Sequence, residues 1–157
     1  MNFERIGLIH RIFPAARFVY CKRHPLDTIL SCYFQDFQAG LNFASDLEVI
    51  TRVYIHHARL MEHWSTRIPE RIHSVDYESL VSNLETVARA MTEFLNCDFD
   101  QAMLKPHQQQ RIVTTASNLQ VRKPIYTTSI NNWKNYRSQL DGVIRLLQEH
   151  SVLDEDP

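Results

Sequence analysis

An arginine and a serine eight residues apart could together bind a phosphate group. Arg23 and Ser31 belong to the segment CKRHPLDTILS, which covers residues 21–31. A guanidinium can bind a phosphate through two parallel hydrogen bonds, and a hydroxyl two helical turns further along can donate another. On the local pattern alone, a surface arginine and a serine bonded within its own helix explain the two residues equally well.

The elements that must position this pair are a strand before it and a helix after it. Residues 17–21 (RFVYC) are mostly β-branched or aromatic, which predicts a short buried strand. Pro25 suits the first turn of a helix, and apolar residues then follow at helical spacing. Arg23 would therefore lie at the carboxyl end of a strand and the amino end of a helix, where α/β folds bind anions.

This segment resembles the sulfotransferase family that uses phosphoadenosine phosphosulfate as its sulfate donor. Three further blocks follow in the family's order: VDYESLV at 75–81, TASNLQVRKPIY at 115–126, and SINNWKNY at 129–136. The resemblance covers roughly residues 2–140. It is strongest to a bacterial branch that is often fused to tetratricopeptide repeats and is related to protein-tyrosine sulfotransferases.

The resemblance implies an α/β fold in which helices cover a P-loop-type parallel sheet. In this family a Gly/Ser/Thr-rich turn near the N-terminus binds the 5′-phosphosulfate. The chain has only 3 glycines, Gly7, Gly40 and Gly142, and none follows a predicted strand. We therefore expect an incomplete sheet that lacks the N-terminal strand and the phosphosulfate loop. Residues 1–150 would form the C-terminal part of a sulfotransferase domain, and 151–157 an acidic tail.

The resemblance also implies a set of donor-binding residues. These are Arg23, Ser31, Tyr77, Ser117, Asn118, Arg122 and Lys123. Arg23, Ser31 and Lys123, with Arg122, would bind the 3′-phosphate, since a group with about two charges binds best to several cations. Tyr77 would contact the adenine. The alternatives are a tyrosine that packs in the core and loop cations that are only solvated.

By the same resemblance, the complete enzyme transfers a sulfuryl group from phosphoadenosine phosphosulfate to an acceptor hydroxyl, which includes protein tyrosine, or to an amine. No metal is needed. The catalytic base has no assigned residue, because it is expected upstream of Met1. Protein-tyrosine sulfotransferases have an arginine where this chain has Gln35, which weakens the case for tyrosine as the acceptor.

Two other functions fit parts of the sequence. The chain could be a nucleotide-binding or interaction module without catalysis, derived from a truncated sulfotransferase. It could also be a nucleoside-phosphate kinase with a related architecture, although the blocks at 120–124 and 129–136 argue against that class. Two parallel strands do not make a self-sufficient sheet. We therefore expect a missing N-terminal segment or a second copy of the chain to complete it.

Composition indicates an ordinary globular protein and argues against several other classes. The 157 residues are 44% apolar and 22% charged, as in an ordinary globular domain, and the net charge of −1 argues against a general nucleic-acid surface. No apolar run approaches the roughly 18 residues of a membrane span, and no signal peptide is visible. Cys21, Cys32 and Cys97 are widely spaced, which predicts reduced core cysteines and a cytoplasmic location.

Besides an apolar helical pattern at 3–13, the remaining sequence predicts three more helices and one more strand. The helices are expected at 47–64 after a capping box at 45–48, at 84–95 with Asn83 as the cap, and at 140–147; the strand is expected at 71–76. Residues 105–130 read as irregular. We expect Asp27 to favour the helix dipole, and Trp133 and Tyr136 to pack the domain.

Overall fold

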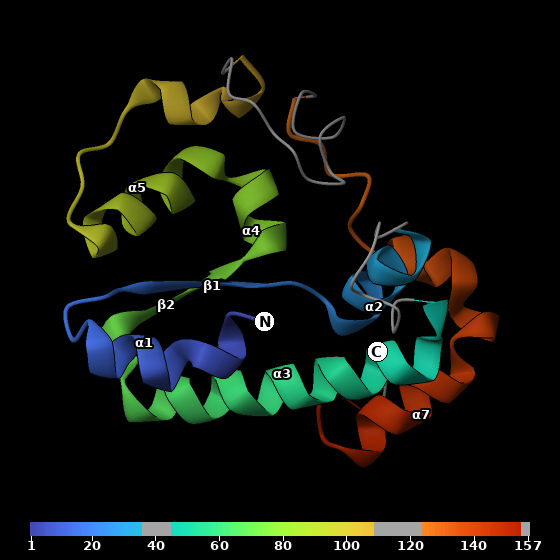
Figure 1. Cartoon of the computed structure of the whole chain (residues 1–157). Coiled ribbons are helices and arrows are strands. Elements are labelled where there is room, and N and C mark those ends of the chain that lie inside the picture. The colour runs from blue at the N-terminus through green and yellow to red at the C-terminus, as the bar shows by residue number, and fades with distance from the viewer. Residues whose placement is uncertain (36–44, 109–123, 155–157) are drawn as a thin grey trace.

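A computed structural model describes residues 1–35, 45–108 and 124–154 of the chain. These residues form an α/β fold around a parallel pair of strands, β1 (Phe18–Lys22) and β2 (Ile72–Asp76). Phe18 lies opposite Ile72 and Lys22 opposite Asp76, so the carboxyl ends of both strands meet at one edge. Helices lie on both sides of the pair, which confirms the predicted fold class (Figure 1).

The helices carry the rest of the described structure. In chain order they are η1 (Phe3–Arg5), α1 (Ile6–Ile12), α2 (Pro25–Phe34), α3 (Leu47–Arg67), η3 (Pro69–Arg71), α4 (Tyr77–Ser82), α5 (Leu84–Leu95), η4 (Gln101–Leu104), η5 (Pro106–Gln108), η6 (Asn132–Gln139) and α7 (Asp141–Glu149). The three helices predicted at 47–64, 84–95 and 140–147 are therefore present as α3, α5 and α7. The short helix α4 was not predicted.

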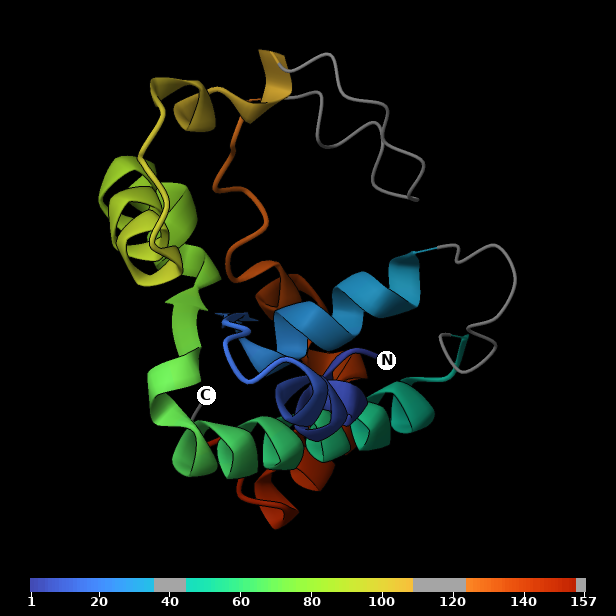
Figure 2. The ribbon, with the colours of Figure 1, turned by 60° about the vertical axis from the view of Figure 1, so that its left-hand side comes forward.

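Two layers enclose the strands. α1 lies against α3 on one side of β1, while α4 and α5 lie on the other side (Figure 1, Figure 2). Phe18 and Tyr20 of β1 pack into the cluster formed with α1 and α3, so they point to that side. Side chains alternate along a strand, and Val19 and Cys21 therefore point toward the side of α4 and α5.

The larger hydrophobic core lies away from the sheet, where α2, α3, η6 and α7 meet. Leu26 and Leu147 are fully buried in it, and Trp133 is 1% exposed. The stripe of apolar residues on α2 thus packs as the helical spacing predicts. Beyond the end of α7, Val152 and Leu153 also pack against this core. The domain boundary at residue 150 stays a prediction.

Strand β1 is less buried than its sequence predicts. Val19 is 40% exposed and Cys21 is also exposed, whereas we expected a buried strand with a core cysteine. The physical reason is that β1 has only β2 beside it within the described part of the chain, and little packs on the face that carries Val19. Cys32, by contrast, packs against the larger core as expected.

Two helix starts also differ from the predicted caps. α3 is capped by Asp46, whose carboxylate accepts a hydrogen bond of 3.0 Å from the Val49 amide, and not by a box that begins at Ser45. Asn83 precedes α5 as predicted, but its side chain makes no capping hydrogen bond. None of the helices in the described ranges is long and apolar enough to cross a membrane.

Candidate functional site

A polar cleft of about 400 Å³ lies at the carboxyl ends of the two strands. Its walls come from one side of α2 along its whole length, the start of α4 and the segment that leads into η6. Arg23 enters it from the turn after β1, Tyr77 from the turn after β2, and Ser31 from the second turn of α2. The edge where both strands end is thus the place where the functional side chains gather, as in other parallel α/β folds.

The guanidinium of Arg23 is held in place by two groups. Its Nη2 donates a hydrogen bond of 2.8 Å to the Ser129 carbonyl oxygen, and its carbon Cζ lies 4.8 Å from the centre of the Tyr77 ring. The ring face attracts the cation. The Arg23 Nε is buried and has no hydrogen-bond partner among the described residues. The side chain is therefore oriented while part of its donor capacity stays unused.

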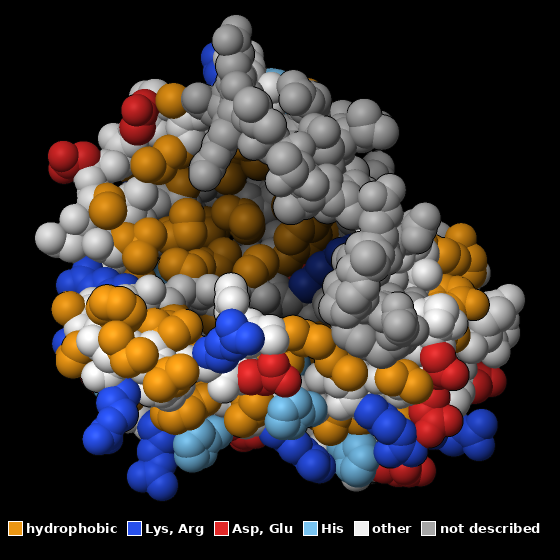
Figure 3. All heavy atoms as spheres, viewed as in Figure 1, with side chains coloured by type: hydrophobic (Ala, Val, Ile, Leu, Met, Phe, Trp, Pro, Cys, Tyr) orange, Lys and Arg blue, Asp and Glu red, His pale blue; other side chains and the backbone are white. Residues whose placement is uncertain are grey.

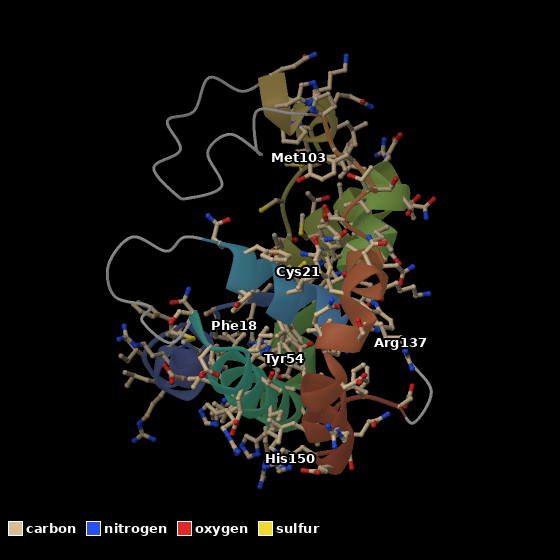
Figure 4. All side chains as sticks on the ribbon, turned by 90° about the vertical axis from the view of Figure 1, so that its right-hand side faces the viewer. Phe18, Cys21, Tyr54, Met103, Arg137 and His150 are labelled. Atoms are coloured by element: carbon tan, nitrogen blue, oxygen red, sulfur yellow. The ribbon has the colours of Figure 1, made fainter. Side chains whose placement is uncertain are left out.

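The peptide group that joins Arg23 to His24 is fixed at both ends. The Tyr54 hydroxyl donates a hydrogen bond of 3.3 Å to the Arg23 carbonyl oxygen, and Glu78 accepts one of 3.1 Å from the His24 amide. Tyr54 lies between α3 and α2 (Figure 4). Its burial raises the pKa of the hydroxyl, which therefore stays a donor. Because a peptide group is planar, these two bonds fix the backbone from which Arg23 projects.

The imidazole of His24, the residue after Arg23, stacks on Trp133. The two ring centres are 5.2 Å apart and the planes differ by 5°. Burial lowers the pKa of His24, and the nearby cations Lys134 and Arg23 lower it further, against the opposing effect of Asp27 and Glu78. The ring packs on an indole beside the turn that carries Arg23 and does not line the cleft, so it gives no sign of being a general base.

Asp27 lies in the first turn of α2, where we expected it to favour the helix dipole, and it has a second structural role that was not predicted. It is only 2% exposed, and its side chain reaches the segment around the start of η6. One carboxylate oxygen accepts a hydrogen bond of 2.8 Å from the Asn131 amide, and the other accepts one of 2.9 Å from the Trp133 amide. Asp27 therefore ties the start of α2 to a segment far along the chain.

Three of the seven residues predicted to bind the donor come together in this cleft: Arg23, Ser31 and Tyr77. The other four, Ser117, Asn118, Arg122 and Lys123, lie outside the described residues, and their roles stay predictions. The two aromatic residues expected to pack the domain behave differently from each other. Trp133 is buried, whereas Tyr136 is 36% exposed and meets Phe34 edge to face.

Sequence reasoning missed several residues of the cleft wall. They are Phe34, Gln35, Tyr126, Thr128, Ser129 and Asn132. The signal that could have found some of them is a run of polar and aromatic residues directly after Pro124, next to the loop predicted to bind phosphate. No signal pointed to Tyr54, because it falls on the apolar stripe of α3 and its hydroxyl bonds a residue 31 positions away.

The arrangement is suited to a phosphate ester that carries an aromatic base. Arg23 supplies charge and directed N–H groups, Ser31 supplies a hydroxyl, and the start of α2 adds the positive end of a helix dipole. Tyr77 and Tyr126 offer aromatic faces at the same cleft. The described residues hold no group of three His, Cys, Asp or Glu side chains that could bind a metal ion.

Comparisons with known proteins agree with this arrangement. Residues 1–101 match the model of the sulfotransferase family. An uncharacterized protein of Aquifex aeolicus (strain VF5) is 38% identical over an alignment 159 residues long, which covers 99% of this chain and 21% of that protein. In fold the chain is similar to the sulfotransferase domain from the curacin biosynthetic pathway, with a TM-score of 0.66 and 22% identity over 87% of this chain and 54% of that one. The chain spans only part of each of these two proteins, and it belongs to the sulfotransferase family.

Proposed function

We propose that this chain supplies the 3′-phosphate and adenine half of the donor site of a sulfotransferase that uses phosphoadenosine phosphosulfate. The observation that carries the proposal is the orientation of Arg23. Its guanidinium is fixed by the Tyr77 ring and the Ser129 carbonyl at the mouth of a cleft that Ser31 also lines. Membership of the sulfotransferase family supplies the class of reaction.

The reaction in the whole enzyme would be an in-line transfer of a sulfuryl group. An acceptor oxygen or nitrogen attacks the sulfur, and the bond from sulfur to the bridging oxygen of the 5′-phosphosulfate breaks. The electron pair leaves with adenosine 3′,5′-bisphosphate, and the acceptor's proton goes to a base. Such transfers depend mainly on positioning and on donors that stabilise the developing charge.

The cleft residues of this chain would act on the nucleotide and not on the sulfur. Arg23 and Ser31 would bind the 3′-phosphate, with Lys123 and Arg122 as further cations, and Ser117 and Asn118 would line the same pocket. Tyr77 would contact the adenine. The catalytic base and the groups that bind the transferring sulfate have no assigned residue here. The acceptor is proposed only as a hydroxyl, which includes that of tyrosine, or an amine.

A titration with two nucleotides tests the donor site. Adenosine 3′,5′-bisphosphate should bind more tightly than adenosine 5′-monophosphate, because only the former carries the 3′-phosphate. Arg23→Ala should weaken binding of the bisphosphate by about ten- to a hundredfold, since a hydrogen-bonded charge contributes roughly 1.5–3 kcal/mol. Isothermal titration calorimetry measures both affinities.

The matched control is Arg89→Ala, which removes the same charge from the exposed ion pair with Glu85 on α5. It should leave both affinities unchanged. Equal affinity of the folded chain for the two nucleotides would contradict the proposal, as would an Arg23→Ala variant that keeps the preference. Sulfuryl transfer by a longer chain would separate the enzyme from a binding module without catalysis.

A further inference from the structure

Among the described residues, Asp27 is a buried carboxylate without a cation partner, which is an unusual feature. The Asp27 side chain is 2% exposed, and the described part of the chain offers it no ion pair. Burying a charge costs free energy unless hydrogen bonds compensate for the lost water. A hydrophobic residue at this position in α2 would avoid that cost. Packing alone therefore does not explain why a carboxylate occupies this position.

The hydrogen bonds of Asp27 connect its carboxylate to the backbone of a distant segment. Both of its oxygens accept backbone N–H groups, from Asn131 and Trp133, which lie 104 and 106 residues further along the chain. Asn131 has a left-handed backbone with a φ of 59°, a conformation that asparagine adopts more readily than most residues other than glycine. The segment 129–133, called the clasp below, is thus fixed from the side of α2.

The same clasp also holds the guanidinium of the candidate site. Ser129 accepts the hydrogen bond from Arg23 Nη2, and Trp133 stacks on the ring of His24. Three side chains from the turn and the first turn of α2, at positions 23, 24 and 27, therefore contact one five-residue segment. Without the bonds from Asp27, the Ser129 carbonyl would lose its fixed position beside Arg23.

We infer that Asp27 is a positioning residue, which acts through the clasp to hold the Arg23 guanidinium in the orientation that binds a 3′-phosphate. Asp27 also lines the cleft, but both of its oxygens accept hydrogen bonds from the clasp, so we expect it to act without binding the phosphate itself. The inference rests on the proposed function, because it names how the same site obtains its geometry. Displacement of a binding group by about 1 Å can cost up to a hundredfold, so a small shift of the clasp would be measurable.

The first test is the variant Asp27→Asn, which keeps the size of the side chain. Its amide oxygen can accept from one N–H of the clasp, but its NH₂ faces the other N–H and cannot accept from it. We expect the variant to lose about ten- to a hundredfold of its affinity for adenosine 3′,5′-bisphosphate. Affinity for adenosine 5′-monophosphate should change little. The ratio of the two affinities is the readout, because general destabilisation would not change it selectively.

A double-mutant cycle then links the effect to Arg23. In an Arg23→Ala background, Asp27→Asn should leave the affinity ratio unchanged, since the group that it positions is absent. The matched control is Thr92→Val, which removes another buried side-chain hydrogen bond, from Oγ1 to the Arg89 carbonyl on α5. This control should lower stability but keep the ratio. An Asp27→Asn variant with the wild-type ratio would overturn the inference.

Hydrogen exchange on the wild-type chain provides a test that does not depend on the variant's folding. The amides of Asn131 and Trp133 should be protected, and adenosine 3′,5′-bisphosphate should protect them more than adenosine 5′-monophosphate does. Binding of the bisphosphate without any change at these amides would overturn the inference. If both amides are protected but the wild type does not prefer the bisphosphate, the proposed function fails, and with it any role of the clasp in binding. If the wild type does prefer the bisphosphate but the amides are unprotected, only the inference fails.

Discussion

At the scale of single residues, the surroundings of His24 determine how easily its imidazole is protonated. It is stacked on Trp133, its Nδ1 is buried without a partner among the described residues, and burial lowers its pKa below the usual 6.5. A histidine that is harder to protonate when folded stabilises the protein above its unfolded pKa. That contribution is lost as the pH falls through about 6.5 toward the lower folded value. Burial lowers the pKa of His57 as well, so the two effects add.

We predict that His24→Phe makes the fold less sensitive to acid. A phenyl ring can stack on Trp133 but cannot be protonated. The urea midpoint of the wild type should fall between about pH 7.5 and about pH 5.5, and it should fall less in the variant. The control is His63→Gln, on the exposed side of α3, which should keep the wild-type dependence. An equal fall in His24→Phe and the wild type would show that His24 does not carry the effect.

At the residue scale, the sequence could predict the groups that face the cleft better than the groups that hold them. Arg23, Ser31 and Tyr77 were found because each follows a strand or lies on the helix after it, and local pattern determines such positions. Glu78 and Asp27 act through hydrogen bonds to residues 54 and 104 positions away. Contacts between residues so far apart produce no periodic pattern in the sequence. The residue types at both ends of each contact are also common in the segments where they occur.

At the scale of elements, helices were predicted closely and the strand environment was not. The apolar spacing in α3 and α5 reflects one buried face, and that periodicity is visible in the sequence whatever the helix packs against. The burial of β1 depends instead on its neighbours in space. Apolar residues such as Val19 favour a strand, but they cannot show whether anything covers its face.

The close contact between α1 and α3 gives a prediction about one glycine. A Cβ built on Gly7 would lie 2.5 Å from the Trp64 ring, so the helix backbone approaches the indole directly. Gly7→Ala should lower the free energy of unfolding by about 1–2 kcal/mol, since overpacking costs roughly 1–3 kcal/mol and the gain in helix propensity offsets up to about 1. Urea unfolding followed by circular dichroism measures the change.

Gly142 in α7 is the matched control, because a Cβ there meets nothing within 4 Å. Gly142→Ala should raise the free energy of unfolding by up to about 1 kcal/mol through helix propensity alone. Opposite signs for the two substitutions are the expected result. A stabilising Gly7→Ala would mean that α1 moves away from α3 at little cost and that the contact with Trp64 is not tight.

At the scale of the whole molecule, the described residues cover one face of the sheet only in part. Figure 3 shows a hollow lined with hydrophobic side chains between β1 and the elements α4 and α5. Val19 and Cys21 of β1 are exposed on that side, because both face away from the hydrophobic cluster that β1 forms with α1 and α3. The sulfotransferase domain of similar fold has 54% of its chain matched, so nearly half of it has no counterpart here. Hydrophobic surface of this kind is typical of an interface.

We propose that a segment upstream in the same polypeptide adds a strand beside β1 and that the chain connected to this strand packs over the exposed face. Val19→Lys tests the proposal, since Val19 is 40% exposed in this chain and would be buried by the chain that packs over this face. In the chain alone the variant should change the free energy of unfolding by less than about 0.5 kcal/mol. In a chain extended by the residues encoded directly upstream, it should lower that free energy by at least about 2 kcal/mol.

Val49→Lys is the matched control, because Val49 on α3 is 41% exposed and lies outside the open face. It should be nearly neutral in both the short and the extended chain. A small effect of Val19→Lys in the extended chain would contradict the proposal. If sedimentation then shows that the short chain dimerises and that Val19→Lys abolishes the dimer, a second copy of the chain covers the face. The same hydrophobic surface would in that case be buried between subunits and not within one domain.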